Sequence, residues 1–128
     1  MEGAKAMQVE ELDFILVPTQ DLQRAKSFYA ETLGLPLDTD SSRWVEVLAG
    51  GVTLALWEPE SMGRSFAPSP NPIALRVPDV AAARAELEAA GVKFDGDIMD
   101  SGVCHMANFA DPDGNRLMLH RRYAPRHR

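Results

Sequence analysis

The sequence predicts an α+β domain built from two βαβββ modules that form an open half-barrel around a cleft. Two observations lead to this fold class. The order strand, helix, strand, strand, strand occurs twice along the chain, and Asp21 and Asp79, the expected N-caps of the two helices, are 58 positions apart. Because each four-stranded sheet has a helix for one face only, the other faces of the two sheets are left to line a cleft.

The length and composition indicate one compact domain over residues 1–128. The chain is 45% hydrophobic and 25% charged, which is ordinary for a globular domain. A domain of this size buries roughly two-thirds of the surface of its unfolded chain, so its core needs neither a disulfide nor a metal. The expected parts are module one over about 10–58, a linker over about 59–71, module two over about 72–123 and a basic tail over 124–128.

In module one, apolar residues at helical spacing predict a helix over 22–33 that ends at Gly34. Two β-rich runs joined by Ala49-Gly50-Gly51 predict a hairpin, because glycine tolerates the positive φ of tight turns. The strands expected in this module are 12–17, 35–39, 43–48 and 52–57.

The linker from Glu58 to Asn71 is rich in proline and serine and has no periodic apolar pattern. After it, Asp79 is expected to cap a helix that ends at Gly91, with Arg84 and Glu88 as an exposed i,i+4 pair. The strands expected in module two are 72–77, 92–95, 103–110 and 116–121, the last two joined by a turn over 111–115.

The charge pattern and the cysteine count exclude several classes of partner. A net charge of −6 argues against nucleic acid, whose phosphates are bound by clustered lysine and arginine. No run of residues has the length of a membrane span, and residues 1–11 do not resemble a signal peptide. The single cysteine, Cys104, excludes an intrachain disulfide and is interpreted as a small buried hydrophobic residue, so we expect a cytoplasmic protein. The basic residues at the end are interpreted as a solvated terminus: Arg121, Arg122, Arg126, His127 and Arg128.

Two segments resemble a known family. Asp21-Leu22-Gln23-Arg24-Ala25, followed by Phe28-Tyr29 and Leu33-Gly34-Leu35, resembles the first helix of glyoxalase I and bleomycin-resistance proteins. Phe109-Ala110-Asp111-Pro112-Asp113-Gly114-Asn115-Arg116-Leu117 resembles their last hairpin. The resemblance covers residues 12–123 and identifies the chain as a member of the vicinal oxygen chelate superfamily (glyoxalase, bleomycin resistance protein, extradiol dioxygenase). Since this fold hosts isomerases, dioxygenases, epimerases, thiol transferases and pure binders, the resemblance implies the fold and not one function.

The resemblance also implies where a metal would be held, on the first and last strand of each module. The four corresponding positions are Phe14, Ala55, Pro72 and Met118. Phenylalanine, alanine and proline have no ligating side-chain atom, and a thioether suits copper(I) better than zinc, nickel, iron(II) or manganese. We therefore expect no metal and no cofactor.

Strand alternation predicts which residues line the cleft, with Arg116, Met118 and His120 on one face of the last strand. The predicted ligand-binding residues are Phe14, Trp44, Ala55, Trp57, Pro72, Arg76, Arg116, Met118 and His120. An apolar, aromatic lining with few polar groups suits a planar or amphipathic organic molecule. No catalytic residue is assigned, because His120 has no identified carboxylate partner and the adjacent Cys104 and His105 point to opposite faces of a strand.

Three functional classes follow from these residues. The first is a small-molecule-binding protein, and the second is a metal-independent enzyme that uses arginine and histidine. The third is a lyase, isomerase or dioxygenase of the same superfamily with displaced metal ligands. The missing metal ligands and the missing acid–base pair favour binding. We also expect a homodimer, since closed two-fold association is common among small proteins. Pairing of the modules within a chain and exchange of modules between chains both stay open.

Overall fold

The computed structural model describes residue 3 and residues 5–126. His127 and Arg128 of the expected basic tail lie outside the described residues. Module one contains β1 (Ile15–Pro18), α1 (Leu22–Lys26), which continues into the wider turn η1 (Ser27–Thr32), β2 (Leu37–Asp40), β3 (Trp44–Ala49) and β4 (Val52–Trp57). Module two contains β5 (Ile73–Arg76), α2 (Val80–Ala89), β6 (Phe94–Asp100), β7 (Cys104–Ala110) and β8 (Arg116–Arg122), and the linker contains a short 3₁₀ turn, η2 (Pro59–Met62).

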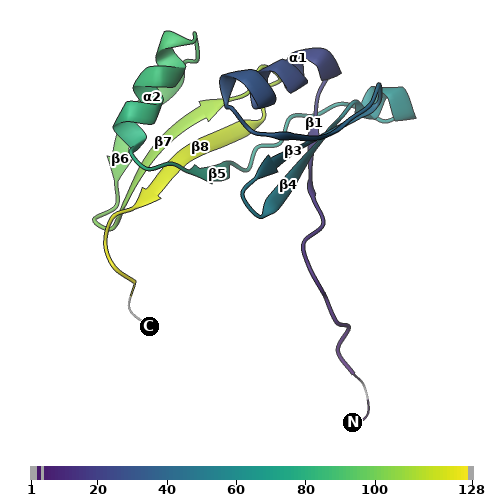
Figure 1. Cartoon of the computed structure of the whole chain (residues 1–128), viewed down its shortest axis with the longest axis horizontal. Helices are drawn as coiled ribbons and strands as arrows, with labels where there is room; N and C mark the ends of the chain where they lie inside the picture. Colours follow the sequence, from purple (N-terminus) through teal and green to yellow (C-terminus); the bar gives the residue numbers. More distant parts are fainter. Residues whose placement is uncertain (1–2, 4, 127–128) are drawn as a thin grey trace.

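Each module forms its own four-stranded sheet. The strand orders are β1-β4-β3-β2 and β5-β8-β7-β6, so the two modules have the same topology. In both, the first strand pairs in parallel with the last, and the remaining pairs are antiparallel. The predicted α+β fold of two βαβββ modules is confirmed. The sheets remain open and separate, with α1 and α2 on the same side of them (Figure 1).

Both helices start where the sequence predicts, because the carboxylates of Asp21 and Asp79 accept hydrogen bonds from Arg24 N and Ala82 N at 3.1 and 3.0 Å. The first helix follows the predicted range 22–33 closely, but it is a regular α-helix only to Lys26. It then widens, and Leu33 N donates to the carbonyl of Phe28, five residues back. The wider turn allows the consecutive residues Phe28 and Tyr29 both to be buried.

Most strands begin or end a few residues from the predicted positions, and β4 alone matches at both ends. Phe14 and Pro72 lie one residue before β1 and β5. Proline has no N–H to donate to a neighbouring strand, which explains the later start of β5. The strand expected over 92–95 extends to Asp100, and its pairing with β7 shifts register between Asp95 and Met99. Gly96 provides the positive φ of +70° in this irregular region. Because Asp and Gly are uncommon in strands, the sequence over 95–100 did not predict one.

One core fills the helix-covered side of both sheets. Alternate residues of the central strands are buried there, and the helices contribute apolar side chains between them. The main members are Val45, Val47, Leu54, Leu56, Ala107, Phe109, Leu117 and Leu119 from the strands, and Leu22, Tyr29, Val80 and Leu87 from the helices. Because the core members share one side, the opposite faces of the two sheets are turned away from the helices. We call these the open faces.

Candidate functional site

The predicted ligand-binding residues lie on the open faces or directly precede them, except that Ala55 of β4 is completely buried. In β3 and β8 the buried residues alternate with half-buried ones, and the predicted residues Trp44, Arg116, Met118 and His120 are in the half-buried set. Phe14 and Pro72 occupy the positions just before β1 and β5. Strand alternation thus gives these residues the side opposite to the core, and their role in binding stays a prediction.

The open face of the first sheet is aromatic. Trp44 and Trp57 are direct partners across β3 and β4. The Phe14 ring contacts the Trp44 ring edge-on, with centroids 5.4 Å apart and planes at 85°. The indole Nε1 of Trp44 donates to a carboxylate oxygen of Glu46 at 2.6 Å. Phe14 and Leu16 remain 40% and 45% exposed, so the face presents a large apolar surface to the solvent.

The open face of the second sheet is more polar. Met118 and His120 of β8 are in register with Ala74 and Arg76 of β5. Arg116 donates to the carboxylate of Asp95, a partner that the sequence argument did not identify. On its other side His120 is in register with Met106, so neither cross-strand neighbour of this histidine is a carboxylate. This arrangement offers cationic groups for orienting a ligand and no evident acid–base pair.

The structure holds the two sets of residues apart. Trp57 borders a hollow of about 330 Å³ whose other walls come from module one and the linker, including Leu16 and Arg64. Arg76 borders a separate hollow of about 510 Å³ beside the turn between β3 and β4. The strands that contact each other most extensively belong to the same sheet. The hollow at Trp57 is thus formed by module one and the linker, whereas residues of both modules line the hollow at Arg76.

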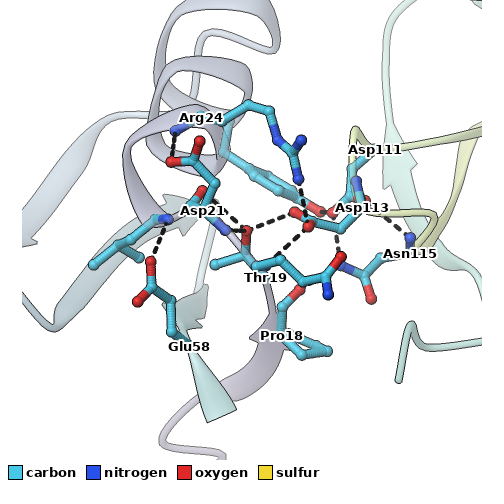
Figure 2. A network of polar contacts seen from close by, with 11 residues as sticks. Pro18, Thr19, Asp21, Arg24, Glu58, Asp111, Asp113 and Asn115 are labelled. Atoms are coloured by element: carbon cyan, nitrogen blue, oxygen red, sulfur yellow. Dashed lines mark hydrogen bonds and ion pairs between the residues drawn. The ribbon is translucent and has the colours of Figure 1, made fainter. Parts of the chain in front are cut away.

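The Asp-Pro-Asp-Gly-Asn turn between β7 and β8 connects the two modules (Figure 2). The buried carboxylate of Asp111 accepts from the hydroxyl of Tyr29 at 2.7 Å and from the side-chain amide of Asn115 at 2.8 Å. The same amide donates to the carbonyl of Pro18 at 2.7 Å. Burial, followed by the charge of Asp111, raises the pKa of Tyr29 above its ordinary value, so this hydroxyl remains a donor.

A second carboxylate of the turn binds the start of the first helix. Asp113 accepts from Thr19 Oγ1 at 2.6 Å, from Gln20 N at 2.9 Å and from the guanidinium of Arg24 at 2.7 Å. We call Thr19, Arg24, Tyr29, Asp111, Asp113 and Asn115 the inter-module latch. Its acceptors are used within the chain, which indicates a structural role for this turn.

The donor set does not fit the metal that the superfamily implies. Three of the four corresponding positions, Phe14, Ala55 and Pro72, carry no donor atom, and the fourth offers the thioether of Met118. Across residue 3 and residues 5–126, no group of three or more His, Cys, Asp or Glu side chains is placed to hold a metal ion. In the same part of the chain, no helix is long and apolar enough to cross a membrane.

Two βαβββ modules with open sheet faces define the fold class of this protein. Comparison with known proteins identifies its family. The chain belongs to the Glyoxalase/Bleomycin resistance protein/Dioxygenase superfamily, which it matches over residues 11–119. No curated protein sequence matches it.

Three solved structures show the range of these relatives. TnmS3, an antibiotic binding protein from Streptomyces sp. CB03234, is 30% identical, with a TM-score of 0.77 over 91% of this chain and 99% of that chain. A glyoxalase/bleomycin resistance protein from the same organism is 31% identical, with a TM-score of 0.72 over 87% and 100%. Lactoylglutathione lyase from Agrobacterium tumefaciens, at 18% identity and a TM-score of 0.75 over 88% and 94%, shares the fold.

Proposed function

We propose that this protein binds an aromatic or amphipathic small molecule on its open faces, without a metal. The observation that carries the proposal is the aromatic surface formed by the exposed Phe14 and the half-buried Trp44 and Trp57, in a chain whose metal-ligand positions are mostly without donors. The similarity to TnmS3, described as an antibiotic binding protein, supports binding as the function. Arg76, Arg116 and His120 on the second sheet would orient a polar group of the ligand.

The apolar contribution alone is modest. Burial of one ligand ring against this surface contributes on the order of 2 to 4 kcal/mol at about 25 cal/mol per Å². A micromolar dissociation constant corresponds to about 8 kcal/mol, so contacts to the cationic residues of the second sheet must supply part of the affinity. A ligand that meets only one of the two open faces would bind weakly.

A metal-independent enzyme of the same superfamily is the second candidate. Arg76 and His120 are in register on neighbouring strands, so a guanidinium is next to an imidazole that can accept or donate a hydrogen bond. If the protein catalyses a reaction, His120→Gln should abolish turnover while ligand binding persists.

The binding proposal predicts a specific loss in one tryptophan variant. A thermal-shift screen of planar aromatic compounds, with mass spectrometry of molecules that copurify, should identify a ligand. Trp57→Ala should then weaken its binding by roughly 1 to 3 kcal/mol, about 5- to 150-fold in Kd, while the protein remains folded. Met62→Ala, at an exposed linker position, serves as the control. Equal affinity of wild type and Trp57→Ala would remove the first sheet from the binding site.

The proposal also predicts that the purified protein contains no stoichiometric transition metal. The reason is the lack of nitrogen and oxygen donors at Phe14, Ala55, Pro72 and Met118. Elemental analysis of protein purified without a chelator or a histidine tag measures this directly. One zinc, nickel, iron or manganese ion per chain, lost together with activity on chelation, would contradict it.

We infer a homodimer, in which the open face of one copy helps to enclose the site of the other. Phe14, Leu16 and Met99 are exposed apolar residues that such an association would cover. Sedimentation should give twice the 14.1 kDa mass of the chain. A 14.1 kDa species at a protein concentration on the order of tens of micromolar would refute the dimer.

We infer a cytoplasmic location, with no nucleic-acid partner. The single cysteine, Cys104, fits a reducing compartment, and the net charge of −6 disfavours phosphate backbones. Cell fractionation that finds the protein outside the cytoplasm would contradict the first part, and salt-sensitive retention on DNA would contradict the second.

A further inference from the structure

Helix α2 leaves one end of the second sheet uncovered. The helix has ten residues and is about 15 Å long, whereas β7 and β8 have seven residues each and extend for about 23 Å. The helix therefore covers the end that carries Phe109 and Leu117. At the other end, beside the start of α2, lies a hollow of about 450 Å³.

His105 and Arg121 line this hollow, and Asp100 lies beside them on the next strand. Asp100, His105 and Arg121 are cross-strand partners on β6, β7 and β8. By strand alternation, His105 and Arg121 share the helix-covered side with the buried residues Ala107 and Leu119. The apolar part of the wall comes from Pro78, Val80, Ala81 and Ile98. The hollow is thus on the opposite side of the sheet from Met118 and His120.

Two aromatic rings form a rigid wall of the hollow. The rings of His105 and Tyr123 are 4.6 Å apart with an interplanar angle of 34°. Asp100 holds both, since it accepts from the Tyr123 hydroxyl at 2.8 Å and lies 3.3 Å from His105 Nε2. The hydrogen bond from Gly102 N lowers the pKa of Asp100, and Asp100 raises the pKa of Tyr123. Near neutral pH the carboxylate and the phenol therefore keep their roles as acceptor and donor.

The hollow offers unused donors. The carboxylate of Asp100 already accepts from Gly102 N at 2.8 Å and from Tyr123, and Asp79 accepts from Ala82 N at the start of α2. Arg121 is exposed, and its guanidinium has no ion-pair partner among the residues that the structure describes. A guanidinium presents a planar fork that matches a carboxylate.

We propose that this hollow is a second ligand site, for an aromatic monocarboxylate. The ring lies against His105, Tyr123 and Ile98, and the carboxylate pairs with Arg121. The volume of about 450 Å³ is within the range of small-molecule sites. Since the open faces contribute none of these residues, this site does not depend on the proposed function above.

Titration of the isotope-labelled full chain with 2-naphthoate, followed by NMR, tests the proposal. We expect saturable shifts at Ala81, Ile98 and Tyr123, and Arg121→Gln should weaken binding at least about tenfold. Arg43→Gln, an exposed arginine of module one, should bind like the wild type. The neutral analogue 2-naphthalenemethanol should bind more weakly than the acid.

Three results would overturn the proposal. They are the absence of saturable shifts up to about 10 mM, wild-type affinity in Arg121→Gln, and shifts confined to Trp57, Arg116 and their neighbours. The last result would place the acid on the open faces. It would support ligand binding on the open faces and contradict a second site beside α2. Because Arg121 is exposed, its substitution is expected to leave the fold unchanged, and the unshifted remainder of the spectrum checks this.

Discussion

The inter-module latch and the open faces differ in chemistry and in how many of their groups find a partner within the chain. In the latch, buried polar groups such as Asp111 and Asn115 have their partners within the chain. On the open faces, apolar groups such as Phe14 and Leu16 are left to the solvent. A satisfied polar network specifies one structure, whereas an exposed apolar surface is available to another molecule. The contrast teaches that residues of the turn that resembles the family hold the fold together, whereas the proposed binding surface consists of residues outside that turn.

This contrast explains why family membership leaves the reaction undecided. The turn over 111–115 connects β7 and β8 to the β1–α1 junction in a chain that lacks the donors for the superfamily's metal. The latch needs no metal to form its hydrogen bonds. A resemblance that depends on this turn therefore reports how the modules join, and the function has to be argued from the open faces.

The largest expected effect is on the latch. Asp111→Ala should lower the free energy of unfolding by about 3 kcal/mol or more, because it leaves Tyr29 and Asn115 with buried, unpaired donors. Urea denaturation measures the change. Asp97→Ala, at an exposed position of β6, is the matched control and should change stability by less than about 0.5 kcal/mol.

Arg116→Gln extends this comparison to the open face. Its ion pair with Asp95 is partly exposed, so its loss should cost less than about 1 kcal/mol of stability. If Arg116→Gln destabilised the protein as much as Asp111→Ala, the distinction between a structural latch and a free surface would fail.

An effect between those of Asp111→Ala and Arg116→Gln is expected for Tyr29→Phe, which removes one donor and leaves the amide of Asn115 on Asp111. The loss should be about 1 to 2 kcal/mol near neutral pH. Since the pKa of Tyr29 is raised in the folded state, the folded chain keeps this proton above pH 10.0, where an unfolded tyrosine loses it. This contribution to stability is present below pH 10.0 and declines as the pH rises further.

The alkaline range therefore provides a second measurement on the same variant. The stability of the wild type should fall more steeply above pH 10.0 than that of Tyr29→Phe. The only other tyrosine, Tyr123, is 49% exposed and is present in both proteins, so its titration cancels in the comparison. Parallel pH profiles would show that the Tyr29 hydroxyl is not held by Asp111 in solution.

Local patterns predicted most of the elements. β4 begins and ends at the predicted residues, and both helix caps lie at the predicted aspartates. Such features depend on residues near in sequence, as when Asp21 accepts from Arg24 three positions later. The widened turn at Phe28 and the long irregular strand β6 were missed, because packing of Tyr29 in the core and pairing with β7 override local propensity.

The candidate site was predictable in part for the same reason. The period of two along a strand assigned His120 and Met118 to one face without any tertiary information. It could not reveal that Asp95 pairs with Arg116, since the two residues are far apart in sequence. Nor could it show that Trp57 and Arg76 border separate hollows.

The sequence by itself determined the two-module order, the helix starts and the loss of the metal ligands, because each of these depends on residue identity or on short-range spacing. Only the tertiary structure decided the role of the turn over 111–115, whose carboxylates accept hydrogen bonds from Tyr29 and Thr19, more than eighty residues away in sequence. The tertiary structure also decided that the open faces are apart and that a hollow lies beyond α2. Contacts between distant residues depend on how the sheets and helices pack, and local periodicity carries no information about them.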